Sequence, residues 1–207
     1  MSYGIRARVV NIEALEGFFG SGNESSLNRV SGWLKNVFPH LDAELPDAPP
    51  AYELLRALVM DPDYRNTQDA WTPQHSAKAI RLLEAITGWF GDPDPQPNRS
   101  WSAMNYGWFG AVDEALTAAG SDARASELLE PHSVAGLAAP IEFPIIHVMT
   151  AERAREWLAK TKDLDLSRTP APERAAIEEM RDWMDYTVDC AEHYPASPGN
   201  SLLSFYF

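Results

Sequence analysis

The most restrictive feature of the chain is its last segment, a run of mostly large apolar residues that reads Leu202-Leu203-Ser204-Phe205-Tyr206-Phe207. Left exposed, such a run is an aggregation hazard, because an unpaired apolar strand pairs with other chains. We therefore expect it to be buried as a strand. A strand at this position completes a sheet only after earlier strands are in place, so the chain must supply further strands.

Two other segments have strand patterns. Residues 3–10 alternate between a face with Tyr3, Ile5, Ala7 and Val9 and a face with Arg6 and Arg8. From residue 141 the apolar residues typical of a strand covered on both faces are Ile141, Phe143, Ile145, Ile146, Val148 and Met149. We expect His147, inside this run, to be a core histidine bonded to a backbone group rather than a general base. Arg6 and Arg8 either hold an anion or pair with carboxylates of a covering helix, and we expect the second.

The rest of the chain predicts helices. Asn11, Thr72 and Thr150 have the side chains of N-caps. Helical spacing of apolar residues occurs around 12–19, 27–38, 54–59, 73–90, 106–119, 150–161 and 170–191. Pro39 is expected to close the second helix, residues 39–50 to form a Pro-rich link and residues 92–98 a stiff loop.

These elements predict one globular domain over residues 1–207 with an α+β fold. Its small sheet has three strands, or slightly more, formed by the N-terminal, late-middle and C-terminal strands. About seven helices are expected to cover this sheet.

Charge and composition limit the classes of partner that this protein is expected to bind. The formal net charge is −13, a sign that repels phosphate backbones and anionic lipid, so we expect neither nucleic acid nor a membrane as partner. Residues 1–100 carry 9 basic and 13 acidic side chains, whereas residues 101–207 carry 8 and 17. No apolar stretch reaches the ~18 residues of a membrane helix. A single cysteine, Cys190, excludes internal disulfides and multi-cysteine zinc sites, so a cytoplasmic location is expected.

The two ends of the chain resemble a known sequence type. The segments that carry the resemblance are Ser2-Tyr3-Gly4, Gly20-Ser21-Gly22, Phe143-Pro144-Ile145-Ile146, Thr150-Ala151-Glu152 and Leu203-Ser204-Phe205-Tyr206-Phe207. They resemble an uncharacterised actinobacterial family of unknown function, and they are more distantly similar to the YfbM-like proteins, which also end in a helix followed by an apolar strand. The resemblance implies the fold and brings no catalytic residues.

An acidic row is the first candidate site. Carboxylates recur at alternating spacings of four and three along the last helix, at Glu178, Asp182, Asp185, Asp189 and Glu192. We interpret Glu178, Asp182, Asp185 and Asp189 as a solvated face that binds a basic partner. Asp189 with His193 has the spacing of a metal-ligand pair. A metal site needs further ligands from another element, and we expect neither a metal nor a cofactor.

An aromatic segment is the second candidate site. Aromatic side chains follow the Pro-rich loop, and a stiff loop can set them around a small apolar or sugar-like ligand. The candidate ligand-binding residues are Arg99, Trp101, Tyr106, Trp108 and Asp113. The alternative is that the tryptophans belong to the core and anchor loops.

The chain contains no P-loop, dinucleotide-binding glycine pattern, Gly-x-Ser-x-Gly elbow or His-Glu-x-x-His. Whether it is an enzyme stays open, and the missing motifs favour a non-catalytic role. We expect a cytosolic binding protein of regulatory or immunity type whose acidic surface engages a basic protein. The alternative is a small-molecule-binding protein or enzyme with an aromatic pocket around residues 99–113.

Overall fold

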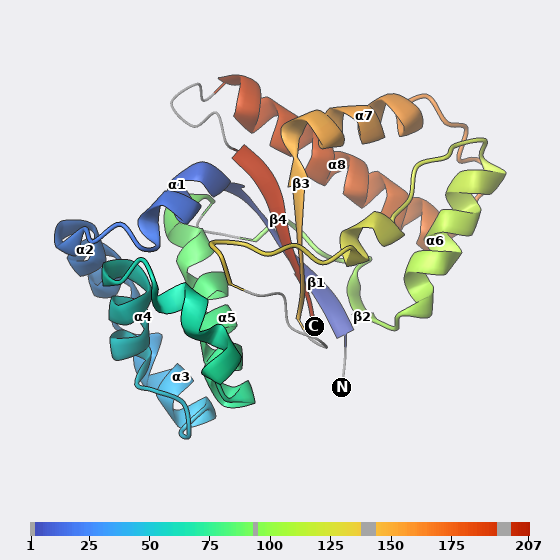
Figure 1. Ribbon diagram of the computed structural model, residues 1–207. Coiled ribbons are helices and arrows are strands. Elements are labelled where there is room, and N and C mark those ends of the chain that lie inside the picture. The colour runs from blue at the N-terminus through green and yellow to red at the C-terminus, as the bar shows by residue number, and fades with distance from the viewer. Residues whose placement is uncertain (1–2, 93–94, 138–143, 194–199) are drawn as a thin grey trace.

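The protein has an α+β fold built on one antiparallel sheet. A computed structural model describes residues 3–92, 95–137, 144–193 and 200–207 (Figure 1). The sheet has the strand order β2-β1-β4-β3, with β1 at Tyr3–Asn11, β2 at Ser102–Met104, β3 at Ile145–Thr150 and β4 at Asn200–Tyr206. The predicted N-terminal, late-middle and C-terminal strands are thus confirmed, and β2 is a short addition at the edge.

The C-terminal strand β4 lies in the middle of the sheet. It pairs with β1 from Ile5 opposite Tyr206 to Asn11 opposite Asn200, and with β3 from Ile145 opposite Tyr206 to Thr150 opposite Ser201. Both edges of β4 are therefore hydrogen bonded, which explains why so apolar a segment is tolerated. The predicted strand residues Ile141 and Phe143 lie outside the described residues.

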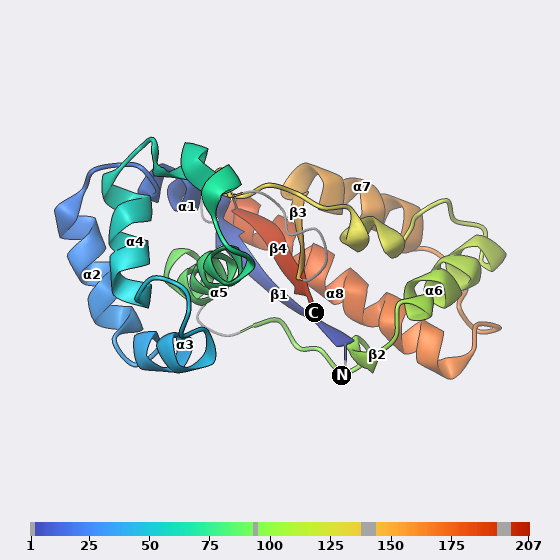
Figure 2. The ribbon, with the colours of Figure 1, turned by 60° about the horizontal axis from the view of Figure 1, so that its bottom comes forward.

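Helices cover both faces of the sheet (Figures 1 and 2). One side is covered by α1 (Ile12–Phe18), α2 (Glu24–Leu34), α3 (Phe38–Glu44), α4 (Ala51–Met60), η1 (Tyr64–Ala70) and α5 (Pro73–Phe90). The other is covered by α6 (Gly107–Ala118), η2 (Ser126–Leu129), α7 (Ala151–Thr161) and α8 (Ala171–His193). Among the described residues there are thus eight α-helices and two 3₁₀ helices, against about seven helices predicted.

The side chains of β1 alternate between the two faces of the sheet, and each face packs against a different core cluster. Ile5, Ala7 and Val9 pack against the α6–α8 layer, whereas Val10 packs with the α1–α5 layer. Arg6 and Arg8 lie on the same face as Val10 and hence toward α5. The two core clusters share a single sheet, and the single-domain organisation over residues 1–207 stays a prediction.

The predicted N-caps are confirmed by their hydrogen bonds. The side-chain oxygens of Asn11, Thr72 and Thr150 accept from the backbone N–H groups of Ala14, His75 and Arg153 at 2.9, 3.1 and 3.2 Å, respectively. Each bond satisfies one of the donors that a helix leaves free in its first turn. These caps place the starts of α1, α5 and α7 at the residues that the sequence indicates.

The prediction for Pro39 is wrong. Helix α2 ends at Leu34, and Pro39 lies in the first turn of a new helix, α3. Proline fits the first turn because its missing N–H would have no helical acceptor there. Part of the expected Pro-rich link over residues 39–50 is therefore helical, up to Glu44.

Gly91 follows α5 and allows the backbone there to pass in close contact with the edge of β1. A Cβ atom at this position would lie 2.1 Å from the backbone oxygen of Val9, a distance that no side chain tolerates. The N–H of Asp92 donates to the same oxygen at 3.0 Å, and the N–H of Gln96 donates to Ala7 O at 2.8 Å. The described part of the Pro-rich loop is thus bound to β1 by backbone hydrogen bonds.

Candidate functional site

The acidic face of α8 consists of Glu178, Asp182, Asp185, Asp189 and Glu192, all of which are exposed. The opposite face of the helix packs into the core through Ala176, Ile177, Met180, Trp183, Met184, Thr187 and Cys190. The apolar stripe faces α6, α7 and the sheet, so the acidic face points to solvent. The structure therefore brings together, along one helix surface, all the residues predicted to bind a partner.

Few positively charged side chains pair with the carboxylates of this face. Arg155 of α7 bonds to Glu192 at 2.9 Å, and His193 Nδ1 lies 2.8 Å from Asp189 Oδ1, a pair that is ionic only when the imidazole is protonated. Within the described part of the chain, Glu178, Asp182 and Asp185 form no ion pair. The same described residues contain no group of three or more His, Cys, Asp or Glu side chains able to hold a metal ion.

The aromatic segment is divided between core and surface. Trp101 is fully buried, and its Nε1 donates to Ala176 O at 3.2 Å. Tyr106 is exposed, and Trp108 is partly buried. Asp113 holds η2 by accepting from the N–H groups of Ala125 and Ser126. Trp101 and Asp113 thus have structural partners inside the fold.

A shallow hollow of about 370 Å³ lies beside this segment, lined by Ser100, Ser102, Met104, Asn105, Trp108, Pro172 and Ala175. Of the predicted ligand-binding residues only Trp108 lines it. Glu179 fixes its rim, since its two carboxylate oxygens accept from the N–H groups of Arg99 and Ser100 at 2.7 and 2.8 Å. The sequence carries no signal for this contact, because Arg99 and Glu179 are 80 residues apart.

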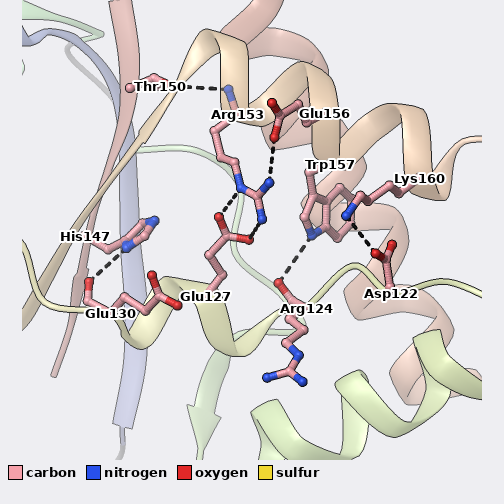
Figure 3. Close-up of polar contacts among 10 residues, drawn as sticks. All are labelled: Asp122, Arg124, Glu127, Glu130, His147, Thr150, Arg153, Glu156, Trp157 and Lys160. Carbon is pink, nitrogen blue, oxygen red and sulfur yellow. Dashed lines mark hydrogen bonds and ion pairs between the residues drawn. The ribbon is translucent and has the colours of Figure 1, made fainter.

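A polar junction that the sequence did not indicate joins η2 to α7 (Figure 3). The guanidinium of Arg153 binds both carboxylate oxygens of Glu127, one bond being Nη2 to Oε2 at 2.9 Å, and also reaches Glu156 at 2.6 Å. These bonds raise the pKa of Arg153, so its charge is permanent. Lys160 and Asp122 add an ion pair at 3.0 Å. A cavity of about 430 Å³ opens here, lined by Asp122, Arg124, Glu127, Glu130 and Arg153.

His147 lies next to this junction on β3, and it is buried. Its Nδ1 lies 2.9 Å from the backbone oxygen of Glu130 (Figure 3), which confirms the expected core histidine bonded to a backbone group. Because a carbonyl oxygen only accepts, Nδ1 carries the proton and Nε2 is left as an acceptor. Nε2 is buried and has no hydrogen-bond partner among the described residues. His147 does not line the cavity, so these contacts fasten η2 to the sheet.

Burial lowers the pKa of His147, with a smaller contribution from the neighbouring His132, whose ring centroid is 4.6 Å away. The bond to Glu130 O and the charges of Glu127 and Glu130 act in the opposite direction but do not cancel the effect. The folded protein therefore favours the neutral imidazole more than the unfolded chain does. In the unfolded chain it binds a proton at about pH 6.5.

His147 is expected to make the protein less stable in mild acid. As the pH falls below about 6.5, the unfolded chain takes up a proton that the folded protein refuses, so the free energy of unfolding decreases, by at most about 1.4 kcal/mol per pH unit for one proton. Above that pH both states are neutral and the effect vanishes. In His147→Asn the side-chain amide can donate in place of Nδ1. The free energy of unfolding of this variant, measured by urea denaturation, should depend less on pH than that of the wild type. The exposed His40→Asn is the matched control and should leave the profile unchanged; equal profiles for wild type and His147→Asn would contradict the assignment.

A family model described as a domain of unknown function, DUF7691, matches residues 1–207. The chain belongs to this family. No curated protein and no solved structure matches the chain. Membership of the DUF7691 family confirms the expectation of an uncharacterised family of unknown function. No helix in the described ranges is long and apolar enough to cross a membrane.

Proposed function

We propose that this DUF7691 protein is a non-catalytic binding protein, of regulatory or immunity type, whose acidic face on α8 engages a basic protein surface. The observation that carries the proposal is the row of exposed carboxylates, three of which have no ion-pair partner among the described residues. We further propose a cytoplasmic location, which agrees with the free thiol of Cys190. The actinobacterial origin and the similarity to YfbM-like proteins stay predictions.

The spacing of the acidic face supports a role in binding. Like charges three and four residues apart destabilise a helix by about 0.2–0.5 kcal/mol per pair, and the row from Glu178 to Glu192 contains four such neighbouring pairs. At 1.5 Å per residue the row extends over about 21 Å. A partner with a basic row of similar length would remove this repulsion on binding, whereas the isolated protein retains it.

The proposal predicts that charge reversal on α8 abolishes binding without unfolding the protein. The triple variant Asp182→Lys, Asp185→Lys and Asp189→Lys changes only exposed positions, so the melting temperature should change by a few degrees at most. The probe is a helical peptide of about 15 residues with lysines at alternating spacings of four and three, which matches the length of the row. Fluorescence anisotropy should show binding to the wild type and at least tenfold weaker binding to the triple variant.

A charge-matched control separates a specific face from net charge alone. Glu53, Asp69 and Glu114 are exposed, form no ion pair within the described residues and lie on α4, η1 and α6. Their replacement by lysine changes the net charge by the same amount and should leave the affinity within about twofold, the screening expected of distant charges. The proposal would be contradicted if the two triple variants lost the same affinity for the peptide, or if the wild type did not bind the peptide.

The second candidate is a small-ligand site at the hollow beside β2. It is favoured by the position of Trp108, an aromatic wall beside the polar groups of Ser100, Ser102 and Asn105. In this reading Arg99, Trp101, Tyr106 and Asp113 support or border the site. Aromatic walls with a few polar groups are typical of sites for sugars and other small neutral molecules.

A further inference from the structure

A hollow of about 290 Å³ lies where α1, α2 and the C-terminal end of α5 meet (Figure 1). Three aromatic side chains line it, Phe18 of α1 and Trp89 and Phe90 of α5. The α2 side is polar and is lined by Ser26 and Arg29. The volume is close to the lower limit for ligand sites, about 300 Å³. The hollow is therefore suited to a small molecule with an apolar part and a polar part.

The aromatic side of this α1–α2–α5 hollow is held in place by ring contacts. Trp89 packs against Trp33 of α2 with ring centroids 6.2 Å apart, and Phe90 packs against Phe18 with ring centroids 5.3 Å apart. Phe18 is buried, whereas the side chain of Trp89 is exposed. An indole ring that is already oriented by a neighbour can stack on a planar ligand with little loss of conformational entropy.

The turn between α1 and α2 is fixed by backbone hydrogen bonds to the end of α4. The N–H of Gly20 donates to Leu58 O at 2.8 Å, and the N–H of Gly22 donates to Val59 O at 2.9 Å. Both glycines have a positive φ, 72° and 64°, a conformation that glycine adopts without steric cost. The start of α2 is therefore held in place relative to α1 and α4.

The polar side of the hollow has hydrogen-bond donors without an acceptor. Ser26 and Arg29 are three residues apart on α2, so their side chains lie on the same side of the helix. Within the ranges that the structure describes, Arg29 forms no ion pair, and neither its guanidinium nor the Ser26 hydroxyl takes part in a hydrogen bond. A guanidinium has five N–H donors.

The charge of the hollow is opposite to that of the whole chain. Among the described residues that line it, Arg29 is the only charged one, whereas the formal net charge of the chain is −13. Charges farther away are screened over about 8 Å at physiological salt. The hollow therefore favours an anionic group, and a guanidinium matches the oxygens of a carboxylate or a phosphate.

We propose that the α1–α2–α5 hollow binds a small planar anion, an aromatic ring that carries a carboxylate or phosphate group. The ring lies against Trp89, and the anionic group accepts hydrogen bonds from Arg29 and Ser26. The basis is the placement of an oriented aromatic wall and an arginine without an ion-pair partner, within the described residues, around one hollow. The site is independent of the acidic face of α8, because that face lies on the other side of the sheet.

Gly17 allows the hollow to be filled without a change in the core. It lines the hollow, and a Cβ atom at this position would have no heavy atom within 4 Å. Gly17→Leu should therefore occupy the hollow and weaken binding at least about tenfold. Because glycine is a poor helix former, the melting temperature should not fall. Gly110→Leu on α6 is the matched control, since a Cβ atom there also has open space, and it should leave the affinity unchanged.

NMR titration tests the proposal with benzoate and phenyl phosphate as probes. Benzoate or phenyl phosphate should bind to the wild type, and the stronger of the two identifies the anionic group. Arg29→Gln should weaken binding about tenfold, the value of one charge-assisted hydrogen bond. Arg56→Gln changes the same charge at an exposed position on α4 and should leave the affinity unchanged. Benzyl alcohol, which has no charge, and cyclohexanecarboxylate, which has no planar ring, should both bind more weakly than benzoate.

The two pairs of variants test the site independently, so Arg29→Gln decides the outcome if Gly17→Leu does not fold. The proposal is overturned if neither benzoate nor phenyl phosphate binds to the wild type. It is also overturned if folded Gly17→Leu binds as tightly as Gly110→Leu, or if Arg29→Gln binds as tightly as Arg56→Gln. Equal affinities for benzoate and cyclohexanecarboxylate would overturn it as well, because Trp89 would then not recognise a planar ring.

Discussion

Deletion of residues 202–207 is expected to abolish cooperative folding. The segment forms most of β4, whose two edges pair with β1 and β3, so its loss removes most of the partner strand of β3 and leaves β1 paired mainly with the short β2. Leu202, Leu203, Phe205 and Tyr206 are all buried, and burial of four such side chains contributes about 6–12 kcal/mol. That amount is similar to the whole stability of an ordinary domain, about 5–15 kcal/mol. The deletion variant should give a far-UV spectrum of reduced intensity and no cooperative urea transition.

A point substitution tests the same strand without shortening the chain. Leu203 is 0% exposed and packs in the α1–α5 core cluster, so Leu203→Asp buries a carboxylate without a partner and should cost more than about 4 kcal/mol. Leu203→Ile preserves volume and should cost less than about 1.5 kcal/mol. A deletion variant that melts cooperatively within a few degrees of the wild type would show that β4 is not the central strand.

The sequence predicts the parts of the fold that rest on local patterns. Alternation marks β1, an apolar run marks β4, and capping side chains at Asn11, Thr72 and Thr150 mark three helix starts. The acidic face of α8 follows from the same logic, because a helix with one buried stripe must expose the opposite residues. Each of these features depends on residues within a few positions of one another.

The features that the sequence did not predict depend on contacts between distant segments. Lys78 is buried on α5, where its ammonium binds Asp42 at 3.0 Å and the backbone oxygen of Pro49 at 2.9 Å. The ion pair between Arg153 and Glu127 joins residues that are 26 positions apart in the sequence. Arg6 Nη1 binds Glu84 of α5 at 2.7 Å, which confirms for Arg6 the expected pairing with a covering helix. The cleft that Arg6 and Arg8 line depends on both the register of β1 and the placement of α5, so the sequence could assign these arginines to a polar face but not to a cleft.

Replacement of Trp101 is expected to have the second large effect. Trp101 is 0% exposed, and it lies against Trp108, Phe109 and Trp183 with ring centroids 6.4, 5.2 and 6.3 Å away. Trp101→Ala leaves a large cavity and removes the side-chain hydrogen bond to Ala176 O, so it should lower the free energy of unfolding by about 3–5 kcal/mol. Trp101→Phe keeps most of the ring volume and should cost clearly less.

Comparison of Trp108 variants with Trp101 variants separates an effect on core packing from an effect on ligand binding. It is partly exposed and lines the hollow, so Trp108→Ala should cost only about 1–2 kcal/mol in urea unfolding. If the hollow binds a sugar-like ligand, titration with a methyl glycoside changes the tryptophan fluorescence of the wild type and of Trp101→Phe but not of Trp108→Ala. Equal destabilisation by the two alanine variants would contradict the division of the aromatic segment into core and surface. A fluorescence response that persists in Trp108→Ala would instead place the ligand elsewhere, because the hollow would have lost its aromatic wall.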